Sequence, residues 1–166
     1  DTNFNFTFAD AADFDYSNGY MNNVEFNNIG NDGIDISGAD IKIDSISLNS
    51  VGDKALSSGE NSILDARDVI ISNSEIAICS KDLSVINIDK ILLQNNKVDF
   101  ALFQKKPEFG PAKIKALNVQ SSNGSQVSHL VEQDSQLILN SEMFYGSIQD
   151  VEGRLYGNEF GRASQK

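Results

Sequence analysis

The chain has 166 residues, 40% of them hydrophobic, and a formal net charge of −11 at pH 7. This acidic excess disfavours nucleic acid and anionic membranes as partners, because binding phosphate needs clustered lysine and arginine. The single cysteine excludes an internal disulfide framework, and no apolar run is long enough to span a membrane. We therefore expect one domain with a core, and cations or neutral molecules such as sugars as ligands.

The chain opens with alternating apolar and polar residues from Asp1 to Phe8, which predict a β-strand. A pattern of apolar positions then recurs every 22 residues, and its first position holds Ala12, Ile34, Leu56 and Ile78. Two further alternating apolar pairs follow each of them, separated by Gly, Asn, Ser and Asp. Three short alternating segments at a fixed period are typical of one turn of a β-solenoid.

The repeat predicts coils that begin near Asp10, Asp32, Lys54, Ile76 and Val98. An insertion from Gln104 to Lys113 holds both prolines, and a sixth coil follows within 127–139. We expect a single domain over 1–166, with 1–9 as an N-terminal strand or cap, 10–142 as coils and 143–166 as a degenerate coil or C-terminal cap. We also expect this domain to come from a larger protein with flanking domains, because the chain has neither an initiator methionine nor a signal peptide.

The turns recur as strictly as the apolar positions. One repeat position holds Asn27, Asn49, Ser72 and Gln94, and the next holds Asn28, Ser50, Asn73 and Asn95. Stacked coils place such residues about 4.8 Å apart, so their amides can form a ladder along the solenoid axis. Asparagine also tolerates the left-handed backbone of a tight bend. The sequence therefore predicts an all-β fold, a right-handed parallel β-helix of about six to seven coils.

Coils of three strands with polar turns resemble the right-handed parallel β-helix family, which includes pectate lyases and polygalacturonases. The segments GDKALSSGENS (52–62), IAICSKDLS (76–84) and FQKKPEFGPAKI (103–114) are similar to repeat proteins of bacterial surfaces. This resemblance covers residues 9–119 and implies the fold, and it implies polysaccharides as a ligand class.

The first strand of each coil carries polar residues that alternation directs outward. One outward column holds Asp13, Asp35, Ser57 and Cys79, and its neighbour holds Asp15, Ser37, Gly59 and Lys81. The adjoining turns and the insertion add Tyr16, Asp32, Glu60, Asp82, Lys105 and Lys106. One face of the solenoid is therefore predicted to be acidic on the early coils and rich in lysine on the later ones.

Three interpretations of this face remain open. The first is a solvated strand face whose ion pairs contribute little. The second is a carbohydrate-binding surface, on which carboxylates hold sugar hydroxyls and lysines hold acidic groups. The predicted ligand-binding residues in that case are Asp15, Asp32, Ser57, Glu60, Asp82, Lys106 and Tyr16.

The third interpretation is catalysis on an acidic polymer. Asp13 and Asp35 would be carboxylates on adjacent coils, near the separation used by retaining glycosidases. Alternatively, the two carboxylates would bind calcium and a lysine, Lys81, Lys105 or Lys106, would remove a proton from a uronate. The Gly-His-Gly and Arg-Ile-Lys motifs of polygalacturonases are absent from the sequence.

We therefore expect a carbohydrate-interacting module of a secreted or cell-surface bacterial protein. The alternatives are a polysaccharide lyase or glycoside hydrolase, and a structural spacer or adhesin stalk without a ligand.

Overall fold

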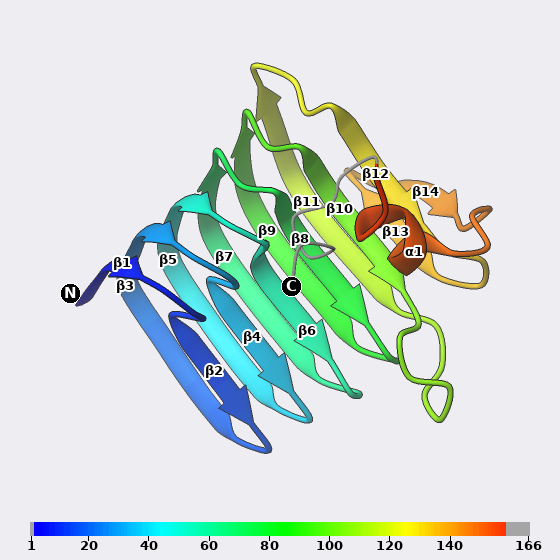
Figure 1. The fold of residues 1–166 in the computed structure, drawn as a ribbon, viewed down its shortest axis with the longest axis horizontal. Helices are drawn as coiled ribbons and strands as arrows, with labels where there is room; N and C mark the ends of the chain where they lie inside the picture. The colour runs from blue at the N-terminus through cyan, green and yellow to red at the C-terminus, as the bar shows by residue number, and fades with distance from the viewer. Residues whose placement is uncertain (1, 159–166) are drawn as a thin grey trace.

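The computed structural model describes residues 2–158, which form a parallel β-solenoid of about six turns (Figure 1). Successive turns are about 22 residues apart, as the sequence repeat predicts. The predicted fold class is therefore confirmed.

The strands form two sheets that face each other across the core. The long sheet has the strand order β1 (Thr2–Thr7), β3 (Asn18–Ile29), β5 (Asp40–Val51), β7 (Ile63–Ser72), β9 (Val85–Gln94), β11 (Lys113–Ser122), β13 (Gln136–Leu139) and β14 (Glu142–Tyr145). The short sheet comprises β2 (Ala12–Asp15), β4 (Ile34–Ser37), β6 (Lys54–Gly59), β8 (Ile76–Lys81), β10 (Val98–Phe103) and β12 (Val127–Val131). All pairs of named strands are parallel except β13 with β14.

The strand register follows the 22-residue repeat residue by residue. Ala12 pairs with Ile34, Ile34 with Leu56, and Leu56 with Ile78. Because equivalent positions stack, the inward residues of every coil meet those of the next and form one continuous aliphatic core. Ile34, Leu56 and Ile78 are completely buried in it.

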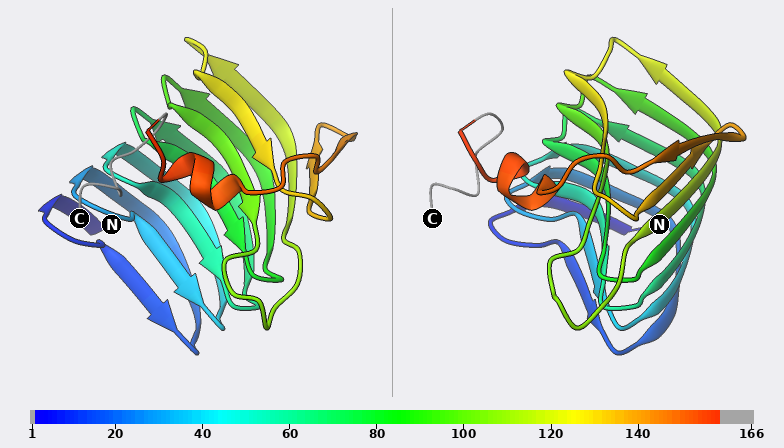
Figure 2. Two further views of the ribbon diagram at one scale, coloured as in Figure 1. Left: turned by 45° about the vertical axis from the view of Figure 1, so that its right-hand side comes forward. Right: turned by 90° about the vertical axis from the view of Figure 1, so that its right-hand side faces the viewer.

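The sequence predicts three strands per coil, whereas the structure joins the second and third into one bent strand. A single residue with positive φ produces each bend, and these residues are Asn23, Ser45, Asp68, Lys90 and Asn118. One left-handed residue turns the chain without ending the ladder, so strand pairing resumes directly beyond it. Figure 2 shows the resulting curvature of the long strands.

The predicted amide ladder is present at the far corner of the long sheet. Asn95 Nδ2 donates to Asn73 Oδ1, and Asn73 Nδ2 donates to Asn49 Oδ1, both at 2.8 Å. Asn73 and Asn95 have φ values of 55° and 53°, in the left-handed region that asparagine tolerates. The corner is therefore held by side chains that stack from coil to coil.

The last part of the described chain departs from the repeat. Strand β14 runs antiparallel to β13, and a five-residue helix, α1 (Val151–Leu155), follows it. Figure 2 shows the orange-red segment with α1 lying on the short-sheet side of the solenoid. Residues 159–166 of the predicted C-terminal segment lie outside the described residues. Within 2–158 no helix is long and apolar enough to cross a membrane.

Candidate functional site

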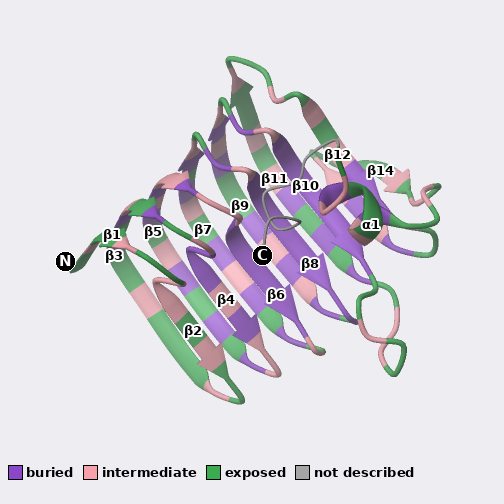
Figure 3. Ribbon diagram, in the orientation of Figure 1, coloured by how far each residue is buried: buried purple, intermediate pink, exposed green. Residues whose placement is uncertain are grey.

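The outer face of the short sheet, where the sequence places its candidate residues, is open at one end and covered at the other. On β2 and β4 the outward residues Asp13, Asp15 and Asp35 are exposed or half-buried. On β6, β8 and β10 every residue is buried, on both faces of the sheet (Figure 3).

Helix α1 provides an apolar cover for the later coils. Val151 and Leu155 belong to a cluster with Cys79, Ala101 and Leu130, which point outward from β8, β10 and β12. These outward positions are small or apolar, so the short helix can pack directly on the sheet. Cys79 is completely buried, and this burial raises the pKa of its thiol to about 12. The cysteine is therefore a packing residue.

A polar pocket of about 400 Å³ lies where the open and covered regions meet. We call it the charged pocket, and its lining residues are Asp10, Asn31, Asp32, Asp35, Asp53, Lys54, Lys81, Lys105, Glu152 and Tyr156. Four of the residues singled out from the sequence, Asp32, Asp35, Lys81 and Lys105, line it together. The others come from the turns before β2, β4 and β6, from the first residue of β6, and from α1 and the residue that follows it.

Lys54 is the most deeply buried of the lysines that line the charged pocket. Its Nζ lies 2.6 Å from Asp53 Oδ2 and 3.3 Å from Asp32 Oδ1, and it sits 5.5 Å from the ring centroid of Tyr156. The two carboxylates raise the pKa of Lys54 despite its burial. Burial raises the pKa of Asp32 to about 6, although Lys54 opposes that shift. One lysine therefore pairs with two carboxylates, and burial makes Asp32 easier to protonate than an ordinary aspartate.

A second lysine of the pocket, Lys81, forms an ion pair with Asp35. Lys81 Nζ lies 3.6 Å from Asp35 Oδ1, an oxygen that is buried and has no hydrogen-bond partner. The lysine reaches from β8 to β4 over Gly59 of β6, where a Cβ atom would stand 3.4 Å from Lys81 Cε. A Cβ at residue 59 would make ordinary van der Waals contact with Lys81, so the lysine lies directly against the backbone of the intervening strand.

Asp13, the other predicted catalytic carboxylate, is the direct strand neighbour of Asp35. Burial and the nearby carboxylates of Asp15, Asp35 and Asp10 raise its pKa, in that order of importance. Asp13 does not line the charged pocket. Among residues 2–158 no three carboxylate, histidine or cysteine side chains gather as metal ligands, and Lys81 already supplies a cation beside Asp35.

The remaining predicted binding residues lie elsewhere. Asp82 is buried, and its Oδ1 accepts the backbone N–H groups of Lys105 and Lys106 at 2.7 Å each, which anchors the insertion. Lys106 is paired with Glu60. Ser57 is completely buried and its hydroxyl has no partner, and Asp15 and Tyr16 are exposed near the open end of the solenoid.

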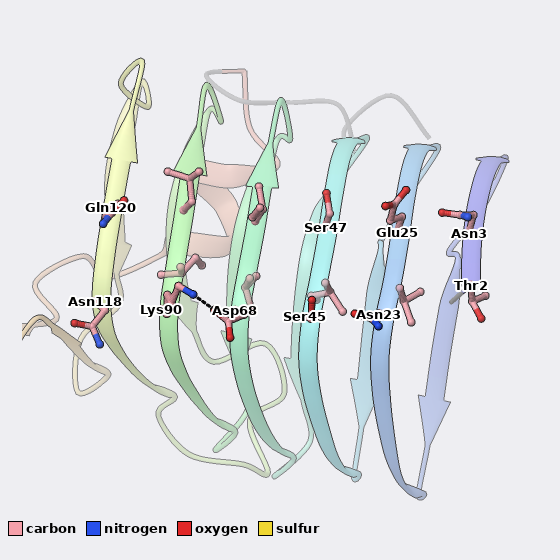
Figure 4. Close-up of a pocket in the computed structure, with 16 residues that line it drawn as sticks. Thr2, Asn3, Asn23, Glu25, Ser45, Ser47, Asp68, Lys90, Asn118 and Gln120 are labelled. Carbon is pink, nitrogen blue, oxygen red and sulfur yellow. Dashed lines mark ion pairs between the residues drawn. The ribbon is translucent and has the colours of Figure 1, made fainter.

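A second and larger concavity, which the sequence analysis did not single out, lies on the outer face of the long sheet. It has a volume of about 720 Å³ and follows the line of bends across six strands (Figure 4). We call it the long-sheet groove. Its bend column is Asn23, Ser45, Asp68, Lys90 and Asn118, and its outward column is Asn3, Glu25, Ser47, Ile70, Leu92 and Gln120. Its floor is formed by Thr2, Val24, Ile46, Val69 and Ile91.

Hydrogen-bonding side chains dominate the long-sheet groove. Amides, hydroxyls and a carboxylate point outward along it (Figure 4), and Ile70 and Leu92 provide an apolar segment near the centre. Asp68 and Lys90 are paired with each other across adjacent strands. The one acid of the lining that remains without a basic neighbour is Glu25, so the groove is close to neutral although the whole chain is strongly acidic.

A signal for this groove is present in the sequence. Inward residues alternate with a spacing of two along each strand, but Met21 and Val24, Ile43 and Ile46, Ala66 and Val69, and Ile88 and Ile91 are three apart. The extra residue is the bend residue. The charged pocket, in contrast, depends on Tyr156 and Glu152, which lie outside the repeat.

Comparison with protein-family models, with curated proteins and with solved structures finds no match for this chain. The resemblance to β-helix proteins therefore stands on the solenoid architecture alone.

Proposed function

We propose that the protein is a carbohydrate-binding β-helix module of a secreted or cell-surface protein, and that the long-sheet groove is its binding surface. The observation that carries this proposal is the bend column, in which each of the strands β3, β5, β7, β9 and β11 presents a polar side chain to a groove that crosses six strands. Five steps between strands correspond to about 24 Å of groove, which suits a short stretch of a linear polymer.

The chemistry of the groove favours a neutral glycan. Amides and hydroxyls both donate and accept hydrogen bonds, as sugar hydroxyls do. Ile70 is 43% exposed, so with Leu92 it offers a surface for the apolar face of a sugar ring. A polyanion would meet Glu25 and would find Lys90 already paired with Asp68. A polymer rich in hydroxyls and without charge therefore fits better than a polyuronate.

The test is binding to a panel of soluble neutral and acidic polysaccharides, measured by isothermal titration calorimetry. Ser47→Arg places a long side chain in the middle of the groove, and Gln120→Ala removes one of its hydrogen-bonding groups. We expect the first variant to weaken binding by about tenfold or more, equivalent to about 1.4 kcal/mol. Lys115→Ala is the matched control, because Lys115 is exposed on the same strand as Gln120 but lies outside the groove. Equal affinity of Ser47→Arg and the unmodified protein would refute the assignment.

One observation favours a second candidate, a lyase or hydrolase at the charged pocket. Asp35 Oδ1 and Lys81 Nζ lie 3.6 Å apart at a pocket and could exchange a proton, and Asp35 Oδ1 still lacks a hydrogen-bond donor. The same polysaccharides should then yield new reducing ends, or the ultraviolet absorbance of unsaturated uronates, and Asp35→Asn and Lys81→Ala should each abolish the signal. Polymer binding without turnover would leave the groove as the functional site.

A further inference from the structure

The side chains of the long-sheet groove repeat with the strand spacing of the solenoid. The residues that flank each bend are in register from strand to strand, and so is the outward column, in which Glu25 pairs with Ser47 and Ile70 with Leu92. The residues of the bend column have φ values between 52° and 64°, so each bend directs its side chain in nearly the same way. Both columns therefore offer one side chain per strand, at steps of about 4.8 Å.

The two columns border the groove on opposite sides (Figure 4). On each strand the bend residue and the outward residue are two positions apart, as Ser45 and Ser47 are, which is at most about 7 Å along an extended strand. The backbone between the columns carries inward residues such as Ile46, which is buried. A ligand in the groove therefore meets a side chain on each of its two edges at successive strands.

This spacing selects among neutral polymers by their linkage. In a β-1,4-linked chain of glucose, mannose or xylose, both linkages of every ring are equatorial, so the chain is an extended ribbon. It advances by slightly more than the strand spacing for each sugar. An α-1,4-linked chain has an axial bond at each ring and coils, so its sugars leave the line of the groove. Over the five steps between the six strands, a β-1,4-linked ribbon stays in register with the strands to within a fraction of one sugar.

The middle of the groove suits the ring faces and the ring edges of such a ribbon. Ile70 and Leu92 are neighbours in the outward column, and Ile70 is 43% exposed. Sugars whose ring substituents are all equatorial, as in β-1,4-linked glucose and xylose, have ring faces made of C–H groups that can cover these two side chains. On the other side of the groove, Asp68 and Lys90 can bind ring-edge hydroxyls while they remain paired with each other.

We propose that the long-sheet groove binds an extended β-1,4-linked neutral glycan, with one sugar at each of its six strands. This inference rests on the proposed function, because it names the polymer class that the same groove binds. The repeat of the polymer then coincides with the repeat of the solenoid. Each added sugar gains contacts with one more strand until the six strands are occupied.

The test is isothermal titration calorimetry with oligosaccharides of two to six sugars. The β-1,4-linked ligands are the cello-, manno- and xylo-oligosaccharides. Maltohexaose is the matched control, because it has the composition of cellohexaose and differs from it in linkage alone. We expect the affinity of at least one β-1,4-linked series to rise up to the hexasaccharide, by about tenfold or more from the trisaccharide, and maltohexaose to bind more weakly than that hexasaccharide by a similar factor.

Two arginine substitutions test the arrangement of the sugars along the groove. Ser47→Arg lies on β5, the third of the six strands, and leaves at most three consecutive strands free, so the hexasaccharide should bind no more tightly than the trisaccharide. Gln120→Arg lies on β11, the last of the six, and leaves five strands free, so the pentasaccharide should keep its affinity.

Three results would overturn this inference and still leave the groove as a glycan-binding site. They are equal losses of affinity in the two arginine variants, an affinity that stops rising at the trisaccharide, and maltohexaose binding as tightly as the β-1,4-linked hexasaccharides. If no oligosaccharide or polysaccharide binds, or if Ser47→Arg binds all of them normally, the proposed function fails and this inference fails with it.

Discussion

Lys54 provides the sharpest test of the energetics of the short-sheet face. Its side chain is 7% exposed and its partner Asp32 is 6% exposed, so the pair lies out of solvent. Removing one partner from a buried ion pair costs about 3–5 kcal/mol, because the other charge stays buried without compensation. Lys54→Met keeps most of the side-chain volume, so the loss of folding free energy should come mainly from the uncompensated carboxylates.

The pH dependence follows from Asp32. Its pKa in the folded protein, about 6, lies above its ordinary value of 3.8, so the folded state binds the proton more tightly than the unfolded state. The corresponding stability, about 3 kcal/mol at about 1.4 kcal/mol per pKa unit, is fully present below pH 3.8 and is lost as the pH rises through 6. Without Lys54 the pKa of Asp32 should rise further. The cost of Lys54→Met should therefore be small near pH 4 and largest near pH 8.

Urea denaturation followed by circular dichroism, near pH 4 and near pH 8, measures the loss of folding free energy caused by Lys54→Met. In the unmodified protein the backbone N–H of residue 54 donates to Asp32 Oδ1 at 2.9 Å. In the double variant Lys54→Met with Asp32→Asn, the side-chain amide oxygen at position 32 can still accept this hydrogen bond. The double variant should recover most of the lost stability, and the cycle gives the coupling energy. A pH-independent cost of Lys54→Met, or a cost below about 1 kcal/mol near pH 8, would refute the account of a buried charge cluster.

Three further outcomes are expected. Asn73→Ala should lower the free energy of unfolding by about 1–3 kcal/mol, because it removes both ladder hydrogen bonds of Asn73 and leaves alanine at a positive φ. Asn73→Gly should lose only the two hydrogen bonds, because glycine adopts positive φ freely, and equal urea midpoints for the two variants would contradict the backbone argument. Asp82→Ala should release the insertion that follows β10, because it removes the acceptor for the backbone N–H groups of Lys105 and Lys106. Proteolysis at these two lysines should become faster, and the free energy of unfolding should fall by about 1–3 kcal/mol for each charge-assisted hydrogen bond. Unchanged cleavage would show that another contact anchors the loop. Cys79 should react with a thiol reagent only as fast as the protein unfolds, because the side chain is buried and burial raises the pKa of its thiol. Immediate labelling of the folded protein would show that α1 leaves this face of the short sheet open.

The repeat made most of the fold predictable. A fixed period forces equivalent residues into register, so the neighbours of Asp35, namely Asp13 and Ser57, follow from the sequence alone. The same logic locates the amide ladder. The bend within each long strand looks like a strand end in the sequence, because two polar residues such as Asn22 and Asn23 separate the apolar pairs as a turn would. A single left-handed residue such as Asn23 turns the chain while strand pairing continues.

The covered half of the short sheet could not have been predicted in the same way. Helix α1 has five residues, fewer than two turns, and so gives no periodic signal. Its position depends on Val151 and Leu155 meeting small or apolar residues of strands far away in the sequence. The burial of Lys54 has a similar origin. Its repeat column holds Asp10 and Asp32 before it and Ile76 and Val98 after it, and this column gives no indication that Tyr156 will lie over the lysine.

The charged pocket and the long-sheet groove differ in whether their side chains are already bound to other groups of the protein. In the charged pocket, Lys54 and Lys81 are each held by a carboxylate of the same protein, so a charged ligand there must displace an internal ion pair. Along the long-sheet groove, Glu25, Ser47 and Gln120 make no side-chain hydrogen bond within residues 2–158 and point outward, so a ligand can bind to them without breaking an existing contact. The stacked coils hold these side chains at regular intervals before any ligand arrives, which lowers the entropic cost of binding a polymer with its own repeat. The long-sheet groove is therefore the stronger candidate for the ligand-binding site, although the sequence points first to residues of the charged pocket.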